Sequence, residues 1–306
     1  MIEVRNLTKT YGNVLAVDGV SFEIHAGEIF GLLGPNGAGK TSTLECMEGL
    51  REPNGGSLRV ANIDPCREPR KLRNVIGVQL QSAGLPESIT PAEAMKIFCA
   101  YHNVSPRFDL LERFGLSEKR NVQFYELSSG QQRRLSLALA VAHTPLVLFL
   151  DEPTAGLDVA TRFELNNLIR ELQASNTTIV MATHDMAEAE EISNRVAILL
   201  NGKIVTVGTP MELTATGAGL TKISVCTQNA SISRLDVAFP AVSRRVSKDN
   251  YSVFFSRDIG PTVAAIITYI ETHGDILIDL RVERPYLEDR FLEITRANGA
   301  QPGEAS

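Results

Sequence analysis

The sequence has only four cysteines, and their spacing argues against a zinc site. Cys46, Cys66, Cys99 and Cys226 are scattered, with no C-x-x-C pair and no histidine at the spacing of a zinc ligand set. Scattered cysteines of this kind are typical of the reduced thiols of a cytosolic protein. We therefore expect no zinc in this protein.

The sequence also lacks an excess of basic residues, since its formal net charge is −6. A protein that works mainly on nucleic-acid phosphates is expected to carry a basic excess. The acidic balance therefore weighs against a nucleic-acid partner, although it leaves room for a local basic patch.

No uninterrupted apolar stretch is long enough to cross a membrane. The longest candidate, Leu135–Leu150, is short of the ~20 residues that a spanning helix needs, and His143-Thr144-Pro145 interrupts it. We interpret it as a buried helix, a break and a buried strand. The start of the chain shows neither a signal-peptide nor a lipidation pattern. We expect a cytoplasmic chain whose membrane role, if any, requires a separate partner chain.

Strand-like and helix-like patterns alternate through the first two thirds of the chain. This alternation predicts an α/β fold with a mostly parallel sheet between helices, and an antiparallel β piece beside it. A helical insertion is expected over about 84–143, where Thr90 and Glu93 form a capping box. The strands expected here are Met1–Leu7, Val20–Ile24, Ile29–Leu33, Val75–Val78, Leu146–Leu150, Thr178–Ala182, Val196–Leu200 and Lys203–Val207.

The pattern changes near residue 215. Strands and helices beyond that point predict a small α+β domain of their own, over 216–297, with a disordered tail over 298–306. The first domain then covers 1–215. The elements expected in the second domain are strands at Ile223–Thr227, Ser252–Phe255 and Ile276–Val282, a helix at Pro261–His273 and a last helix that includes Leu287, Phe291 and Ile294.

The strongest motif is Gly34–Thr41, which matches G-x-x-x-x-G-K-[ST] in full between an apolar strand and a helix. Its glycines let successive N–H groups turn toward phosphate oxygens, and the helix N-terminus favours an anion. Lys40 can reach the β- and γ-phosphates, and Thr41 can ligate Mg²⁺. An ordinary glycine-rich turn is the weaker alternative, because both the match and its context fit. The motif predicts the phosphate-binding loop of a P-loop NTPase, made of Gly34, Pro35, Asn36, Gly37, Ala38, Gly39, Lys40, Thr41 and Ser42.

A second motif ends the apolar run that precedes Asp151 and Glu152. A carboxylate at the end of a buried strand is costly unless it has a partner. Asp151 is best explained as a carboxylate linked to Mg²⁺, often through water, and Glu152 as the group that orients the attacking water. Taken alone, two acids after an apolar run describe a strand that meets solvent, but the phosphate-binding loop in the same chain favours the catalytic interpretation.

The third motif, Leu127–Gln131, comes just before a helix and by itself would only indicate a capping turn. With the two motifs above, in this order, it resembles the nucleotide-binding subunits of ATP-binding-cassette (ABC) transporters. The resemblance covers about Met1–Leu213 and implies a RecA-like core that binds and hydrolyses ATP. It also implies ATP contacts from Ser128, Ser129, Gly130 and Gln131. Ser129 departs from the family's L-S-G-G-Q pattern, and its side chain is expected to crowd the phosphate and alter the rate without abolishing function.

Four further positions match the family pattern. Tyr11 resembles the aromatic that stacks on adenine, although a strand-end Tyr is more often only packing. Gln81 resembles the glutamine that contacts Mg²⁺ and senses the membrane partner, with Gln79 as a near alternative. Asp158 is similar to the aspartate of the inter-subunit loop, and His184 to the switch histidine that contacts the γ-phosphate. The resemblance thus implies a catalytic set and a metal set. The catalytic set is Lys40, Gln81, Glu152 and His184, and the metal set is Thr41, Gln81 and Asp151.

The resemblance further implies a dimer, as a homodimer or with a paired ATPase subunit, in which each signature motif completes the partner's ATP site. It also implies a separate integral-membrane permease and a place on the inner face of the cell membrane. The segment 284–292 resembles the ending of daunorubicin-resistance-type export ATPases, apart from Tyr286, and an amphipathic helix with an acidic cap would produce part of the same pattern. Export of a drug, antibiotic, lipid or other hydrophobic compound is therefore expected.

The sequence disfavours three other functions. A soluble ABC-type ATPase that acts on nucleic acid or ribosomes is disfavoured by the acidic charge and by the lack of heptads. A regulatory module without hydrolysis is disfavoured by the presence of Glu152 and His184. A GTPase is disfavoured because the sequence has no N-K-x-D segment.

Overall fold

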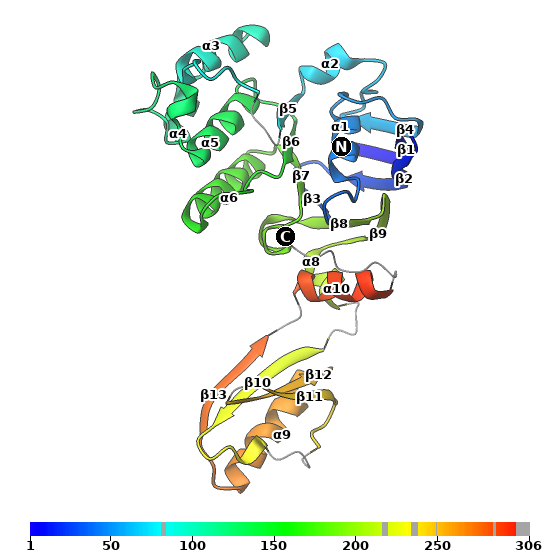
Figure 1. Ribbon diagram of the computed structural model, residues 1–306, viewed down its shortest axis with the longest axis vertical. Coiled ribbons are helices and arrows are strands. Elements are labelled where there is room, and N and C mark those ends of the chain that lie inside the picture. The colour runs from blue at the N-terminus through cyan, green and yellow to red at the C-terminus, as the bar shows by residue number, and fades with distance from the viewer. Residues whose placement is uncertain (81–83, 216–219, 234–237, 249, 284–285, 298–306) are drawn as a thin grey trace. The chain divides into compact units, whose positions relative to one another are not determined.

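The computed structural model describes residues 1–80, 84–215, 220–233, 238–248, 250–283 and 286–297. It divides the chain into two compact units, Met1–Pro210 and Met211–Ser306, which are described separately. Figure 1 shows the elements of both. The sequence placed the boundary at 215, and the expected tail over 298–306 lies outside the described residues.

A six-stranded sheet forms the centre of the first unit, in the order β5-β6-β7-β3-β8-β9. All neighbouring strands in it are parallel except β8 and β9, which are antiparallel. Every residue of β3, β6 and β7 is buried, as expected for parallel strands covered on both faces. The predicted α/β fold with a mostly parallel sheet is therefore confirmed. The strands are β3 (Ile29–Leu33), β5 (Ile76–Gln79), β6 (Val147–Asp151), β7 (Thr178–Thr183), β8 (Arg195–Leu200) and β9 (Lys203–Gly208).

A smaller antiparallel sheet, in the order β2-β1-β4, is the predicted antiparallel β piece. Its strands are β1 (Ile2–Tyr11), β2 (Val14–Ile24) and β4 (Gly55–Val60). Two glycines, Gly55 and Gly56, begin β4. Gly56 has φ +89°, and a Cβ there would lie 2.4 Å from the Asn6 carbonyl oxygen, so glycine permits β4 to approach β1 closely.

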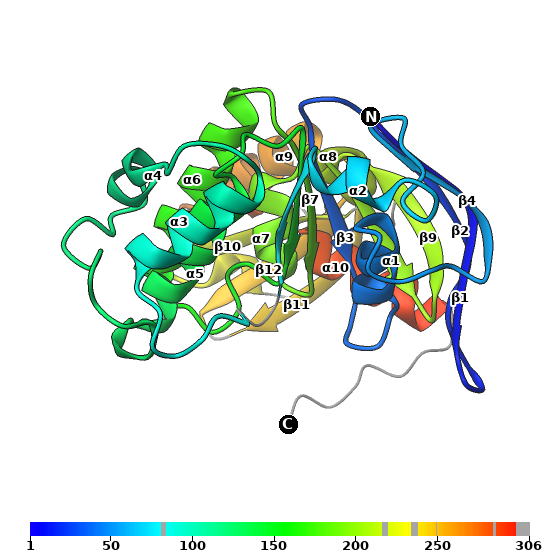
Figure 2. The ribbon, with the colours of Figure 1, turned by 90° about the horizontal axis from the view of Figure 1, so that it is seen from above.

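The helices of the first unit fall into two groups. Helices α3 (Pro91–Tyr101), α4 (Phe108–Arg113) and α5 (Ser129–Ala140), with the short 3₁₀ turn Phe124–Glu126, form the predicted helical insertion between β5 and β6. Figures 1 and 2 place this insertion on the side of the unit away from β1, β2 and β4. The capping box is present, because Glu93 N donates to Thr90 Oγ1 over 3.3 Å and Thr90 N donates to the Glu93 carboxylate over 2.9 Å. The remaining helices are α1 (Lys40–Met47), α2 (Pro69–Arg73), α6 (Val159–Ala174) and α7 (Met186–Ile192).

The second unit contains an antiparallel sheet in the order β11-β12-β10-β13. Helix α9 (Ile259–Thr272) packs on one face of it through a core that includes Ile223, Phe254 and Ile266. The strands are β10 (Thr221–Thr227), β11 (Val242–Lys248), β12 (Tyr251–Ser256) and β13 (Leu277–Glu283). The sequence analysis did not find β11, because its alternating serines and arginines lack an apolar run. The other elements are α8 (Pro210–Ala215), a 3₁₀ turn at Ser231–Ser233 and α10 (Leu287–Ala297).

None of the helices in the described part of the chain has both the length and the apolar character that a membrane crossing requires.

Candidate functional site

The glycine-rich segment turns sharply between β3 and α1. Gly37 and Gly39 adopt φ values of +80° and +99°, which are strained for residues with a side chain. A Cβ at Gly34 would lie 2.4 Å from the Leu199 carbonyl oxygen, and one at Gly39 would lie 2.3 Å from that of Ala16. These close approaches explain why glycine is needed at both positions. The turn leaves the first N–H groups of α1 without helical partners and directed at an incoming anion.

The segment forms one wall of a pocket of about 520 Å³, within the usual range for small-molecule sites. The sequence-predicted residues that line it come from the end of β1, from the phosphate-binding loop and from the position directly after β6. They are Tyr11, Asn36, Gly37, Ala38, Gly39, Lys40, Thr41, Ser42 and Glu152. The pocket is thus a nucleotide-sized space beside the phosphate-binding loop.

Sequence reasoning missed the rest of the lining, which comes from the β1–β2 hairpin and the β8–β9 turn. These residues are Val14, Leu15, Ala16, Asn201 and Gly202. The sequence does carry one signal for them, since Val14 and Leu15 are adjacent aliphatic residues three and four positions after the predicted Tyr11. They are 66% and 48% exposed, which provides apolar surface at the pocket mouth.

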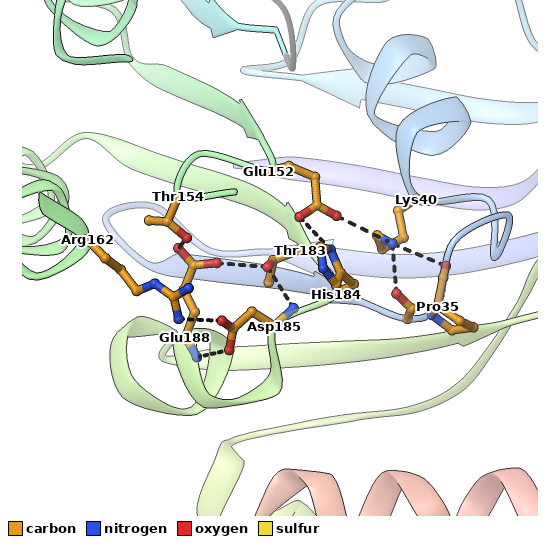
Figure 3. A network of polar contacts seen from close by, with 10 residues as sticks. Pro35, Lys40, Glu152, Thr154, Arg162, Thr183, His184, Asp185 and Glu188 are labelled. Carbon is orange, nitrogen blue, oxygen red and sulfur yellow. Dashed lines mark hydrogen bonds and ion pairs between the residues drawn. The ribbon is translucent and has the colours of Figure 1, made fainter. Parts of the chain in front are cut away.

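Lys40 extends from the start of α1 back along the loop, as Figure 3 shows. Its Nζ donates to the Gly34 carbonyl over 2.7 Å and to the Pro35 carbonyl over 3.2 Å, and it lies 3.7 Å from Glu152 Oε1. Burial lowers the pKa of Lys40, while the charges of Glu152 and Asp151 act in the opposite direction. The ammonium is therefore held at the loop by two carbonyls and a carboxylate.

Asp151 is the last residue of β6 and is only 4% exposed, and its Oδ1 has no hydrogen-bond partner. Burial raises the pKa of this carboxyl, against the lowering effects of the Thr41 hydroxyl and the Lys40 charge. An orphaned buried carboxylate oxygen beside a hydroxyl fits a hard cation such as Mg²⁺, which typically takes one or two protein oxygens and completes its shell with phosphate and water. Within the described residues, no group of three or more His, Cys, Asp or Glu side chains surrounds a possible metal position.

Glu152 follows Asp151 with a left-handed backbone, φ +48°. A non-glycine residue in this region is strained, and the strain is maintained by the surrounding structure. Glu152 N donates to the Ala182 carbonyl over 2.9 Å, and Oε2 lies 2.8 Å from His184 Nδ1. The turn thus aims the carboxylate between Lys40 and His184 (Figure 3). His184 itself follows β7, its side chain is 53% exposed, and it is not among the residues that line the pocket.

A buried hydrogen-bond network holds the segment that carries His184 (Figure 3). The Glu188 carboxylate accepts from the Thr154 hydroxyl over 2.6 Å and from the Thr183 hydroxyl over 2.8 Å. Burial raises the pKa of Glu188, and these two hydroxyls oppose that rise. Asp185 caps α7 and pairs with Arg162 over 2.6 Å. Sequence reasoning missed this network, although Asp185 and Glu188 have the spacing of a helix-capping pair.

Tyr11 ends β1 and is 39% exposed at the pocket. Its hydroxyl donates to Glu45 Oε2 over 3.4 Å, and Lys9 Nζ lies 5.1 Å from the ring centroid. The exposed ring, with the Lys9 ammonium over one face, still offers flat aromatic surface for a planar group.

The residues of the third predicted motif do not line this pocket. Ser128 caps α5, accepting from Gln131 N over 3.3 Å, while Ser128 N donates to Gln131 Oε1 over 3.0 Å. Ser129 is the first helical residue and is exposed, so the backbone there does not require glycine. Gly130 does require it, because a Cβ would lie 2.6 Å from a Thr161 methyl group.

Asp158 and Gln79, one of the two candidate glutamines, do not line the pocket either. Asp158 caps α6, accepting from Thr161 N over 3.0 Å, and this bond lowers its pKa. Gln81 lies outside the described residues. Gln79 ends β5, is 1% exposed, and neither of its amide heteroatoms has a hydrogen-bond partner.

Comparisons with known proteins decide the family. A model of the family described as ABC transporter matches residues 17–155. The Nod factor export ATP-binding protein I of Ralstonia nicotianae is 34% identical over 304 residues, covering 96% of this chain and 94% of that protein. The chain belongs to the ATP-binding proteins of ABC transporters.

Other relatives of this ABC protein support the same placement. A daunorubicin resistance ATP-binding protein of Streptomyces coeruleorubidus is 32% identical, over 96% of this chain and 95% of its own length. A solved dimeric ATP-binding cassette in a post-hydrolysis state with ADP and Pi is 27% identical, with a TM-score of 0.64 over 68% of this chain and 98% of that one. The predicted family, fold and ATPase class are thus confirmed, and the roles of individual residues stay predictions.

The burial of Asp151 has a consequence for the stability of this ABC protein. A carboxyl whose pKa is raised on folding binds protons more readily in the folded state, so stability falls as pH rises through its titration. We expect Asp151→Asn, with nucleotide and Mg²⁺ absent, to raise the urea midpoint at pH 8 and to raise it less at pH 5.

The matched control is Asp18→Asn, at a carboxylate that forms only a surface ion pair with Lys203. It should change the midpoint little at either pH. A midpoint lowered by Asp151→Asn at both pH values would contradict the account of Asp151 as a destabilising buried acid.

Proposed function

We propose that this protein hydrolyses Mg-ATP in the pocket beside Gly34–Ser42, within a dimer of ATPase subunits, and thereby drives a separate membrane permease that exports a hydrophobic compound. The observation that carries the catalytic part is the cluster of Lys40, Glu152 and His184, which are joined by contacts of 3.7 and 2.8 Å at the pocket.

Each side chain of the cluster has a distinct part in hydrolysis. Glu152 accepts a proton from the attacking water and orients it, because its carboxylate faces the pocket and the strained turn fixes its direction. Lys40 binds the β- and γ-phosphates and His184 the γ-phosphate. Tyr11 stacks on the adenine ring through its exposed face.

Thr41 and Asp151 are the residues that would hold Mg²⁺, with Gln81 as the third expected contact. The orphaned Asp151 Oδ1 supports this assignment. When bound, the ion neutralises charge that develops on the phosphate oxygens.

A second subunit explains why the signature residues Ser128–Gln131 are separate from the pocket, with Ser128 and Ser129 exposed. The N-terminus of α5 offers unpaired N–H groups to an anion that its own chain does not supply. The partner's triphosphate is such an anion, and a γ-phosphate bound from both sides adds charge-assisted bonds that ADP cannot make. ATP then favours the closed dimer and hydrolysis releases it. The solved relative described as dimeric supports this arrangement.

The names of the relatives support export, since one is a Nod factor export protein and another a daunorubicin resistance protein. The matching C-terminal segment begins at Arg284 and Pro285, which lie outside the described residues, and continues into α10. Tyr286 N donates to Asp289 Oδ2 over 3.0 Å, so the acidic pattern also serves to cap α10. A permease partner places the protein at the cytoplasmic face of the membrane, and the cargo contacts that partner.

The catalytic role of Glu152 is tested by Glu152→Gln. The amide keeps the shape of the side chain but cannot accept the proton, so we expect ATP turnover to fall by about 100-fold or more. Binding of Mg-ATP should persist, and the dimer should accumulate in size-exclusion chromatography with Mg-ATP. Glu118→Gln, at an exposed acid, is the control and should turn over normally. Normal phosphate release by the Glu152 variant would remove this residue from the mechanism.

The transport role is tested by co-purification from membranes solubilised in detergent. We expect an affinity-tagged chain to retain an integral-membrane protein, and to sediment neither with ribosomes nor with DNA, in keeping with the net charge of −6. Co-sedimentation with ribosomes or DNA, without a membrane partner, would favour a soluble ABC ATPase instead.

A further inference from the structure

The sheet of the second unit has two unlike edges. Its order is β11-β12-β10-β13, so β11 and β13 are the edge strands in the described part of the chain. Strand β11 contains Arg244 and Arg245 and no acidic residue, which discourages pairing with another copy of itself. No residue of β13 is buried, and it carries exposed aliphatic side chains. Natural proteins usually protect an exposed apolar edge of this length, so β13 is expected to be covered.

The apolar surface at this edge is continuous along the chain. Ile276, Leu277 and Ile278 are 59%, 38% and 62% exposed, and Val282 is 41% exposed. Single exposed aliphatic residues are common on protein surfaces, whereas a consecutive group on an open strand marks an interaction site.

The charges of β13 indicate what covers it. When two identical antiparallel strands are related by a twofold axis, one residue lies opposite its own copy. We place this axis at Leu280, which is the middle residue of β13 (Leu277–Glu283). In this register Asp279 lies opposite the partner's Arg281, and the symmetry produces the pair twice. The register of β13 with β10 shifts between Leu277 and Asp279, so the regular pairing around this axis extends from Asp279 to Arg281. Moving the axis by one residue would place Asp279 opposite Asp279 of the partner subunit, or Arg281 opposite the partner's Arg281, and like charges opposed across strands are destabilising.

The two charged side chains are already ordered for such a contact. Arg281 Nε and the Tyr251 hydroxyl each donate to Asp279 Oδ2 over 2.7 Å. Leu280 pairs in register with Val225, whose side chain belongs to the core under α9, so Asp279 and Arg281 project from the other face of the sheet. Side chains that are fixed before association lose less entropy when the two strands pair.

We propose that β13 pairs antiparallel with β13 of a second copy of this chain around Leu280, forming one sheet across two subunits. The contact does not involve nucleotide. It therefore goes beyond the ATP-dependent dimer proposed above, and it keeps two subunits together after hydrolysis has opened their ATP sites.

The test is sedimentation velocity of the full chain in EDTA without nucleotide. We expect the wild-type chain to form a dimer. Arg281→Asp alone and Asp279→Arg alone should each weaken it by about tenfold or more, because each substitution places like charges opposite one another at both symmetric pairs. Arg244→Asp makes the same charge change on the other edge of the sheet and is the control, which should leave the dimer intact.

Two rescue arms separate strand pairing from simple loss of stability. The double variant Asp279→Arg/Arg281→Asp restores opposite charges in the homodimer and should recover association. An equimolar mixture of the two single variants should form a heterodimer, because one chain then carries two basic residues at positions 279 and 281 and the other carries two acidic ones.

Three results would overturn the proposal. They are a wild-type chain that stays monomeric in EDTA at about 100 μM, single variants that associate like the wild type, and a mixture that fails to reassociate. Ile278→Lys gives an independent check, since a lysine at this exposed position should also weaken the dimer. The ATP-trapped dimer is scored as the increase in association that Mg-ATP produces over EDTA in the Glu152→Gln variant, so the two proposals fail separately.

Discussion

Three ionisable side chains, Lys40, Asp151 and Glu152, are buried together at the carboxyl end of the parallel sheet, and the site depends on their mutual compensation. They are between 4% and 7% exposed. One ammonium beside two carboxylates leaves an excess of negative charge, and Asp151 Oδ1 remains without a hydrogen-bond partner. Buried charge that is not fully paired is costly. Under the proposed function, Mg-ATP supplies the cation and the oxygen-rich anion that compensate these charges.

The fold provides the rigidity that this arrangement requires. Strands β3, β6 and β7 are adjacent and entirely buried, and each delivers a part of the site from its carboxyl end. The phosphate-binding loop follows β3, the two acids end β6 and His184 follows β7. The buried bonds of Glu188 to Thr154 and Thr183 then link the segments after β6 and β7. Under the proposed function, the nucleotide lies beside segments that follow several strands of one sheet, so its charge acts on all of them.

Much of this was predictable from the sequence, because the decisive signals are local. The glycine-rich motif lies between an apolar strand and a helix, and the acids follow an apolar run, so both could be placed without knowing the fold. Asn201 and Gly202 reach the pocket from a distant part of the chain, and they were missed because they have no local signal. Strand β4 was also missed, because only its pairing with β1 allows two glycines in a strand. Strand β11 was missed because its sequence has no apolar run that would predict a strand. The strain at Glu152 was also beyond sequence reasoning, since a left-handed glutamate is held by tertiary bonds to the neighbouring strand.

The central claim is tested most directly by the equilibrium affinity for Mg-ATP, measured by titration calorimetry on the full chain and on Lys40→Ala. The account predicts saturable binding that requires Mg²⁺. In the alanine variant it predicts affinity weakened by about 30-fold or more, since the charge-assisted bonds to phosphate are lost while buried carboxylates remain. Absence of magnesium-dependent binding in the wild type, or equal affinity in the variant, would contradict it.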